Sequence, residues 1–264
     1  MTRYTEAEHR RIADDVWRDG FAIVRDFFPR AKIDAWRTAF MPLFQRHVEI
    51  EGHLRNRGPG RYYVTLPFAE PYSDPEIFAD EDVLAVMELL VGADPVMPQL
   101  ATDTPVRGSE YQEIHRDMPP LFRETGEETR PFCVVINFPL IDVTPAHGPV
   151  EIARRTHLMD KEKTLPRVES GEFPLESLPL AIGDVMFRDP RGLHRGTPNN
   201  TDEPRPMVVI GYSRKWFYRP EVSIDVPRAA LDALPERAKR LLRFNPVVEK
   251  LEPYAGEIYQ AFQY

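Results

Sequence analysis

The first fifty residues predict two amphipathic helices with one strand between them. Apolar side chains recur every three or four positions over 5–18 and again over 31–47, the spacing that places them on one helix face. Between these segments, apolar and β-branched residues dominate FAIVRDFF (21–28), a composition typical of a strand. Pro42 falls inside the second helix, where we expect a kink or a helix boundary.

From about residue 95 the pattern changes to short β-rich segments separated by clusters of proline, glycine, asparagine and aspartate. These segments are 96–103, 109–115, 132–138, 183–188, 193–197 and 206–213. Many short strands joined by rigid loops are typical of a jelly roll, the double-stranded β-helix found in cupins. We therefore predict a mainly β fold with flanking α-helices and a cupin-like jelly-roll core over about 95–215.

A single domain over 1–264 is the simplest prediction, because the sequence contains no internal repeat, low-complexity segment or clear linker. This domain would combine N-terminal helices over about 5–50 with the β core and a C-terminal helix over about 227–244. A further short helix is predicted at 82–91. The proline- and glycine-rich segment 51–80 is expected to be irregular.

Charge and composition argue against several classes of protein. The formal net charge of −8 and the pI near 5.5 disfavour a nucleic-acid surface and binding to anionic membranes. The sequence has no apolar run long enough to span a bilayer, and its polar N-terminus does not resemble a signal peptide. Cys133 is the only cysteine, which leaves no intrachain disulfide and no thiolate cluster. A reducing, cytoplasmic location is the plain expectation.

Two histidines and one carboxylate form the candidate metal site. His115 and Asp117 are two positions apart, so their side chains project from the same face of an extended segment. His194 lies 79 residues after His115, a separation that a β core can close. These donors suit iron(II) with open coordination positions, but zinc hydrolases use similar ones. A metal-dependent hydrolase and a non-catalytic cupin-like binding protein therefore remain alternatives.

Arg205 follows His194 by eleven positions, after the turn sequence PNNTDEP. We expect residues 193–198 and 205–213 to pair as a hairpin, which would place Arg205 roughly 13 Å along the ladder from the neighbour of His194. A guanidinium binds a carboxylate through two parallel hydrogen bonds. A keto diacid that chelates iron at one end would present its far carboxylate to this arginine.

Four segments together resemble the phytanoyl-CoA dioxygenase family of iron(II)/2-oxoglutarate oxygenases. The family's opening strand has a counterpart in GFAIVRDFF (20–28), and its first metal motif in EIHRDMPPLF (113–122). The strand and loop that follow resemble VVINFPLIDVTPAHGPVEI (134–152). The block with the distal histidine and the arginine resembles GDVMFRDPRGLHRGTPNNTDEPRPM (183–207). The similarity runs from about residue 8 to 215.

The resemblance implies that iron(II) is held by three ligands, His115, Asp117 and His194. It also implies that the distal carboxylate of 2-oxoglutarate binds to Arg205. Further candidate residues of the co-substrate pocket are Asn137, Gln112 and Thr197, whereas the family counterpart of His157 looks structural. The implied enzyme uses dioxygen, releases succinate and carbon dioxide, and oxidises an unactivated C–H bond. Because related halogenases lack the carboxylate, Asp117 favours hydroxylation, and desaturation, ring closure and epoxidation remain alternatives that depend on substrate placement.

The substrate is expected to be a small molecule, with no nucleic-acid or membrane partner, and the oligomeric state is left open. Two loop segments, 51–72 and 116–131, are expected to act as lids, because long loops around a rigid β core commonly carry specificity. Four arginines within these segments are candidate contacts for an acidic substrate, although ordinary surface positions are the favoured interpretation. They are Arg55, Arg57, Arg61 and Arg123.

Overall fold

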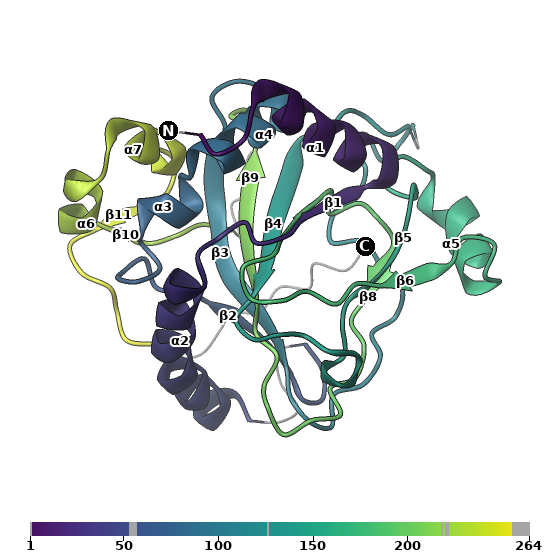
Figure 1. Cartoon of the computed structure of the whole chain (residues 1–264), viewed down its shortest axis with the longest axis horizontal. Helices are drawn as coiled ribbons and strands as arrows, with labels where there is room; N and C mark the ends of the chain where they lie inside the picture. Colours follow the sequence, from purple (N-terminus) through teal and green to yellow (C-terminus); the bar gives the residue numbers. More distant parts are fainter. Residues whose placement is uncertain (1, 53–56, 126, 218, 220–221, 255–264) are drawn as a thin grey trace.

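Six strands form the central sheet, and every neighbouring pair in it is antiparallel (Figure 1). The computed structural model describes residues 2–52, 57–125, 127–217, 219 and 222–254. In spatial order the strands are β1 (Phe21–Val24), β7 (Val185–Arg188), β4 (Cys133–Pro139), β9 (Met207–Ser213), β3 (Val96–Pro105) and β2 (Arg61–Thr65). Segments that are far apart in the sequence therefore lie side by side in one sheet.

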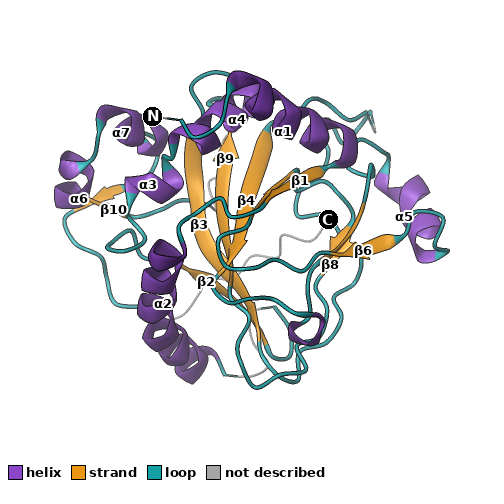
Figure 2. Ribbon diagram, viewed as in Figure 1, coloured by secondary structure: helices purple, strands orange, loops and turns teal. Residues whose placement is uncertain are grey.

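A smaller antiparallel sheet carries one of the candidate metal ligands, His194. It consists of β6 (Leu175–Ser177), β5 (Glu151–Ala153) and β8 (His194–Arg195). A separate parallel pair is formed by β10 (Val226–Pro227) and β11 (Val247–Val248). The predicted fold class, mainly β with flanking α-helices, is confirmed (Figure 2).

Helices pack along the central sheet at several strands. α1 (Glu6–Asp19) packs on β1 and on α4 (Glu81–Val91), and α4 in turn packs on β4 and β9. α2 (Arg30–Glu51) packs on β2, and α7 (Glu236–Leu242) packs on β3. Further short helices are α3 (Pro75–Phe78), α5 (Lys161–Glu169), α6 (Arg228–Ala233) and the 3₁₀ turn η1 (Pro145–His147).

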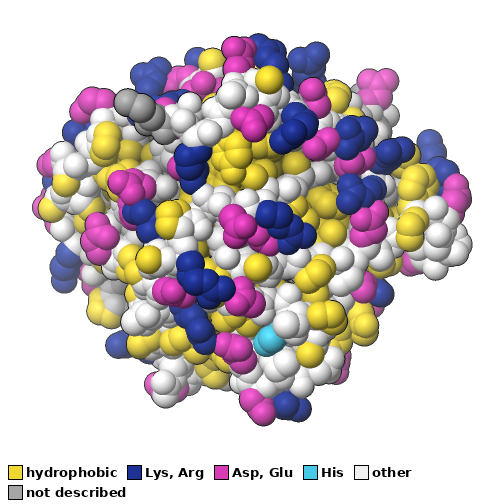
Figure 3. Space-filling view, in the orientation of Figure 1, with side chains coloured by type: hydrophobic (Ala, Val, Ile, Leu, Met, Phe, Trp, Pro, Cys, Tyr) yellow, Lys and Arg dark blue, Asp and Glu magenta, His cyan; other side chains and the backbone are white. Residues whose placement is uncertain are grey.

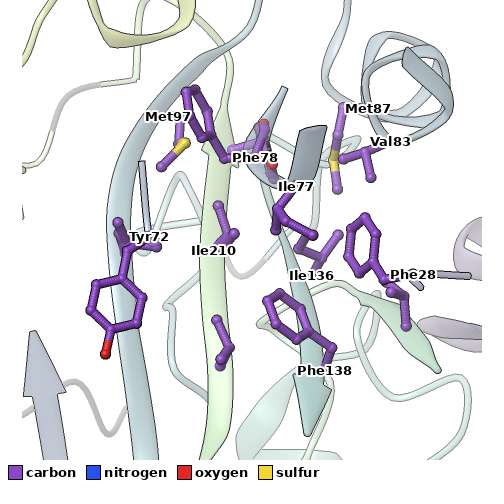
Figure 4. Packing of buried hydrophobic residues seen from close by; sticks show 14 of the residues in the cluster. Phe28, Tyr72, Ile77, Phe78, Val83, Met87, Met97, Ile136, Phe138 and Ile210 are labelled. Carbon is purple, nitrogen blue, oxygen red and sulfur yellow. Dashed lines mark hydrogen bonds between the residues drawn. The ribbon is translucent and has the colours of Figure 1, made fainter. Parts of the chain in front are cut away.

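The central sheet has one face in the hydrophobic core and one face that lines a pocket. Along β4, Val134, Ile136 and Phe138 are buried in the main core together with side chains of α1, α2 and α4, and Figure 4 shows part of this packing. The intervening Val135 and Asn137 line the pocket instead. This alternation follows from the two-residue period of a strand. The helices thus cover one face and leave the other to the candidate site.

The surface mixes both signs of charge. On the face drawn in Figure 3, lysine and arginine side chains lie beside aspartate and glutamate side chains. One exposed pair joins Arg30 of α2 to Asp142 at 3.0 Å, although such pairs contribute little to stability individually. Within the described ranges, no helix combines the length and the apolar character needed to cross a membrane.

Two predictions about strands near the candidate site are wrong. Residues 109–115 do not form a strand; only His115 makes an isolated bridge, with His194, because SEYQEIH offers little apolar surface to a sheet. The hairpin expected between 193–198 and 205–213 is also absent, since β8 pairs with β5 whereas β9 pairs with β3 and β4. Three prolines in the connecting segment lack the N–H that a ladder requires.

The predicted strand at 21–28 is shorter than expected, and the segment 51–80 is more regular. The strand ends at Val24 because the chain turns at Asp26, whose φ is 50°. The described part of 51–80 contains β2 and α3, and residues 53–56 lie outside the described residues. The alternating sequence of β2, RYYVT, accounts for its pairing with β3.

Of the two outcomes expected at Pro42, a helix boundary is excluded because α2 runs through this residue without interruption, and a kink stays a prediction. One prediction about helices is wrong. The helix expected over 227–244 is divided into α6 and α7 at Pro235, which lacks the N–H needed to continue the first helix and then caps the second.

Candidate metal centre

A pocket lies on the face of the central sheet that points away from the hydrophobic core. Strands β3, β4, β7 and β9 contribute side chains to it, and residues in and beside β8 line its other side. Six of the seven site residues predicted from the sequence line this pocket. Its wall also contains apolar side chains, namely Val135, Val150, Met186, Met207 and Val209.

The three predicted metal ligands lie together in the lining of the pocket. Nε2 of His115 is 3.6 Å from Oδ1 of Asp117, and Nε2 of His194 is 3.4 Å from Oδ2 of the same carboxylate. One ligand atom from each residue lies within 4.8 Å of the others. The backbones of the two histidines are held by reciprocal N–H to C=O hydrogen bonds of 3.0 Å, and Asp117 N–H donates to the Pro190 carbonyl.

The other nitrogen of each imidazole is occupied by a backbone carbonyl. Nδ1 of His115 donates to the Glu113 carbonyl at 2.7 Å, and Nδ1 of His194 donates to the Gly192 carbonyl at 2.9 Å. A carbonyl oxygen only accepts, so this pairing assigns the hydrogen to Nδ1 and leaves the Nε2 lone pair available. Both Nε2 atoms face Asp117, which is the arrangement that a shared metal ion requires.

Burial and neighbouring charges favour the protonation states that bind metal. Burial lowers the pKa of His194 to about 4, against the opposing effect of Asp117, so the imidazole is neutral near pH 7. Burial alone would raise the pKa of Asp117, but the neighbouring His194, which becomes charged at low pH, and the Arg188 guanidinium hold it well below its ordinary range. Neutral imidazoles and an ionised carboxylate are the forms that ligate a metal.

Sequence reasoning missed Arg188, the last residue of β7, which is in contact with the candidate ligands. Its side chain is almost fully buried, and its Nη2 donates to Oδ2 of Asp117 at 2.7 Å. Nε lies 3.3 Å from Oδ1 of Asn137. The available signal was a charged residue in a strand, VMFR, whose other members are apolar.

Arg205, which lines the same pocket, is buried with unsatisfied donors. Its exposed fraction is 2%, and Nε and Nη2 have no hydrogen-bond partner among the described residues. Burial lowers the pKa of this guanidinium to about 10, with Asp103 acting against the shift, so it remains charged at pH 7. A buried charged donor without a partner is costly, so Arg205 is a candidate contact for an anion.

Neighbouring Arg61 is equally buried, but its donors have partners. Nη1 contacts Asp103 at 3.1 Å, and Nη2 donates to the Thr197 carbonyl at 3.0 Å. Arg61 is therefore held by contacts within the protein, and it is not among the residues that line the pocket. Of the other arginines, Arg57 lines the pocket and Arg123 lines an adjoining one, whereas Arg55 lies outside the described residues.

Three weaker candidates for co-substrate contacts have different surroundings. Oε1 of Gln112 accepts from Gly196 N–H at 2.9 Å, and Nδ2 of Asn137 donates to the Val208 carbonyl at 3.1 Å. Both residues line the pocket. Thr197 does not line it, because its hydroxyl turns away and donates to the Pro149 carbonyl at 2.7 Å. The structure thus gives no support to a pocket role for Thr197.

The expected structural role of His157 agrees with its surroundings. It is buried away from the pocket, and its Nε2 lies 3.1 Å from the Trp17 carbonyl of α1. The expected lid 116–131 is anchored near both of its ends, because Glu128 pairs with Arg116 at 2.6 Å and with Arg191 at 3.0 Å. These buried pairs fasten the loop to the segment that carries His194.

The fold and the donor set are typical of a class, the non-haem iron enzymes in which two histidines and one carboxylate leave part of the metal open. The phytanoyl-CoA dioxygenase (PhyH) family model matches residues 16–207, and this chain belongs to that family. The family uses iron(II), 2-oxoglutarate and dioxygen. The expected family and cofactors are therefore confirmed, and the chain is an enzyme of the iron/2-oxoglutarate-dependent superfamily.

Solved structures share this fold at low sequence identity. EvdMO1 matches with a TM-score of 0.62 and 18% identity over 78% of this chain, which spans only 50% of the EvdMO1 chain. The α-ketoglutarate-dependent epimerase SnoN from nogalamycin biosynthesis matches with a TM-score of 0.59 and 20% identity, and the match covers 80% of this chain and 84% of the SnoN chain. HygX from Streptomyces hygroscopicus, with nickel and 2-oxoglutarate bound, matches with a TM-score of 0.59 and 19% identity. This match covers 79% of this chain and 88% of the HygX chain. A further HygX structure contains hygromycin B.

The residues present fit an iron(II) ion with 2-oxoglutarate beside it. Two imidazoles with free Nε2 atoms converge on one ionised carboxylate, which is a donor set that suits iron(II). The unsatisfied guanidinium of Arg205 lines the same pocket and offers the charge and geometry that a carboxylate needs. The fit to the metal ion and the fit to the co-substrate are therefore both argued from side chains of this protein.

Proposed function

We propose that this enzyme hydroxylates an unactivated C–H bond of a small-molecule substrate, with His115, Asp117 and His194 holding iron(II) and Arg205 binding the distal carboxylate of 2-oxoglutarate. One observation carries the proposal: a convergent histidine–carboxylate cluster and a buried guanidinium with unsatisfied donors line one pocket. The cluster alone would also suit a hydrolase. The buried arginine adds the need for an anionic second ligand.

When bound, iron(II) and 2-oxoglutarate supply oxidation by dioxygen, which gives succinate, carbon dioxide and a hydroxylated substrate. The protein contributes position and environment. The Gly192 and Glu113 carbonyls fix the imidazole orientations, and Arg205 fixes one end of the keto acid. The apolar wall, which includes Val135 and Met186, limits the water that reaches the reacting atoms.

Hydroxylation is favoured over halogenation because Asp117 is present. This carboxylate fills the position that a halide takes in related halogenases. It does not decide between hydroxylation and desaturation, ring closure, epoxidation or epimerisation, and the structural similarity to the epimerase SnoN is a reason to measure the product directly. A small-molecule substrate is favoured by the pocket and by the hygromycin B bound in a HygX structure.

The proposal is tested by measuring succinate formed from 2-oxoglutarate under air, with iron(II) supplied. Wild type is expected to form succinate even without substrate, slowly and in an uncoupled reaction, and His115→Ala is expected to form none. His147→Ala is the matched control, because His147 belongs to η1 and is not one of the three candidate ligands. Equal succinate production by His115→Ala would refute the ligand assignment. Absence of succinate in iron-loaded wild type would favour the hydrolase or binding-protein alternative.

A further inference from the structure

We propose that Arg188 is a positioning residue of the metal centre, which commits one oxygen of Asp117 to its guanidinium and leaves the other for the metal. The inference rests on the metal site proposed above. Nothing in the motifs that identify the site points to this residue, and its contacts alone carry the argument.

The guanidinium contacts two of the three candidate ligands. Nη2 donates to Oδ2 of Asp117 at 2.7 Å, the short distance of a charge-assisted hydrogen bond. Nη1 lies 3.4 Å from Nδ1 and 3.3 Å from Nε2 of His194. An in-plane hydrogen bond cannot reach both nitrogens of one ring, and Nδ1 already donates to the Gly192 carbonyl. Nη1 therefore lies over the face of the imidazole and leaves the in-plane lone pair of Nε2 free.

Arg188 is itself held by the central sheet. It ends β7, between Phe21 of β1 and Val135 of β4. Its Nε contacts Oδ1 of Asn137 at 3.3 Å, and Nδ2 of Asn137 donates to the Val208 carbonyl of β9 at 3.1 Å. A chain of contacts thus runs from β9 through Asn137 and Arg188 to Asp117. This chain gives Asn137 a role that sequence reasoning did not assign.

Asp117 needs such support because it lies in a loop. Its side chain is 26% exposed, where the pocket meets an adjoining one that it also lines. A carboxylate with both oxygens free can bind a metal through both and so fill a position that the reaction needs open. Arg188 occupies Oδ2, so Asp117 binds through Oδ1 alone. A guanidinium beside a divalent metal ion repels that ion and so opposes metal binding. The orienting role explains why Arg188 is nevertheless placed here.

The test is the binding of cobalt(II) alone to the metal-free protein. The affinity is measured by titration, and the visible d–d spectrum reports the coordination number of the bound ion. Arg188→Met is expected to bind cobalt(II) roughly 10–100-fold more weakly than wild type, with an altered spectrum. Arg188→Lys keeps the charge but loses the planar fork, so it is expected to remain weak. Arg195→Met is the matched control, since Arg195 adjoins His194 but pairs with Glu151.

Unchanged or tighter cobalt(II) binding by Arg188→Met, with the wild-type spectrum, would overturn the inference, because the guanidinium would then act only as an opposing charge. Thermal unfolding of the metal-free variants separates misfolding from a local effect. If Arg188→Met does not fold, Asn137→Ala serves in its place, with weaker binding and an altered spectrum expected because it frees Nε. Failure of wild type itself to bind cobalt(II) would count against the proposed function, not against Arg188 specifically.

Discussion

The histidine–carboxylate cluster and Arg205 differ in how far their polar groups are satisfied. In the cluster, the Asp117 carboxylate is already paired with Arg188, and each histidine already donates through Nδ1. Arg205, which lines the same pocket, is buried with Nε and Nη2 unpaired among the described residues. The cluster is therefore held by contacts within the protein, whereas Arg205 keeps donors that those contacts do not use.

This difference separates two kinds of buried arginine, those whose donors have partners within the protein and those whose donors do not. Arg61, Arg188 and Arg205 are all buried arginines near one pocket. Two of them are fixed by partners within the protein, and one has donors left over. Buried donors without a partner are uncommon in folded proteins, so the two unpaired nitrogens distinguish Arg205 from Arg61 and Arg188 more sharply than burial or charge does.

The largest expected effect comes from removing the carboxylate of the cluster. Asp117→Ala deletes a candidate metal ligand and leaves Arg188 without its carboxylate, so succinate formation should fall roughly a thousandfold, or about 4 kcal/mol in barrier. The rate is measured with iron(II) and 2-oxoglutarate under air. The exposed Asp142 provides the control variant, Asp142→Ala. A rate within tenfold of wild type in Asp117→Ala would contradict the account.

The stability of the metal-free protein should distinguish the two kinds of arginine. Arg61→Met breaks contacts with Asp103 and the Thr197 carbonyl and should cost about 3 kcal/mol, because a buried ion pair loses one partner. Arg205→Met removes unpaired donors and should leave the free energy of unfolding within about 1 kcal/mol, or raise it. Urea unfolding measures both values. Equal losses in the two variants would show that Arg205 is satisfied by the protein.

Gly196, which also lines the pocket, should tolerate no side chain. A Cβ there would lie 2.5 Å from both Nη1 of Arg61 and Oε1 of Gln112. Gly196→Ala should destabilise the protein by about 1–3 kcal/mol through overpacking. Gly192→Ala is the control, because the nearest atom to its Cβ would be at 3.6 Å. Equal thermal stabilities of the two variants would contradict the close approach.

The smallest effect concerns Cys133, in the wall of the pocket. Burial raises the pKa of this thiol to about 12, so it is protonated and unreactive at pH 8. Burial favours the neutral thiol over the charged thiolate. We therefore expect the thiol to react only well above pH 8 or after unfolding. Iodoacetamide at pH 8 should leave the native protein unmodified and alkylate it in urea, as mass spectrometry would record. Rapid alkylation of the native protein would contradict a buried, protonated Cys133 thiol.

The sequence was sufficient to predict the fold class and the residues that converge at the pocket. His115 and Asp117 are close in the chain, and the segment around His194 resembles a family motif, so their meeting did not depend on knowing strand order. Their role as iron ligands stays a prediction. The expected hairpin was wrong because strand pairing depends on long-range contacts, which the local pattern of residues 193–213 does not contain.

Arg188 and Thr197 show what local patterns leave out. Arg188 ends a strand of buried residues. It contacts the candidate metal ligand Asp117 only because of where β4 and the Asp117 loop lie in the folded protein. Thr197 is next to Gly196, which does line the pocket, but its hydroxyl reaches the Pro149 carbonyl instead. Side-chain direction at such positions follows from tertiary packing, which sequence spacing does not encode.

The most direct test of the central claim is an anaerobic titration of the metal-free protein with iron(II) and then 2-oxoglutarate, watching the visible charge-transfer band of a chelated keto acid. Wild type should develop the band, and Arg205→Met should need at least roughly thirtyfold more 2-oxoglutarate, the factor expected when a buried charge loses its partner. Arg107→Met, at an exposed arginine paired with Asp202, should behave as wild type. Iron binding without the band, or equal titrations of wild type and Arg205→Met, would contradict the account.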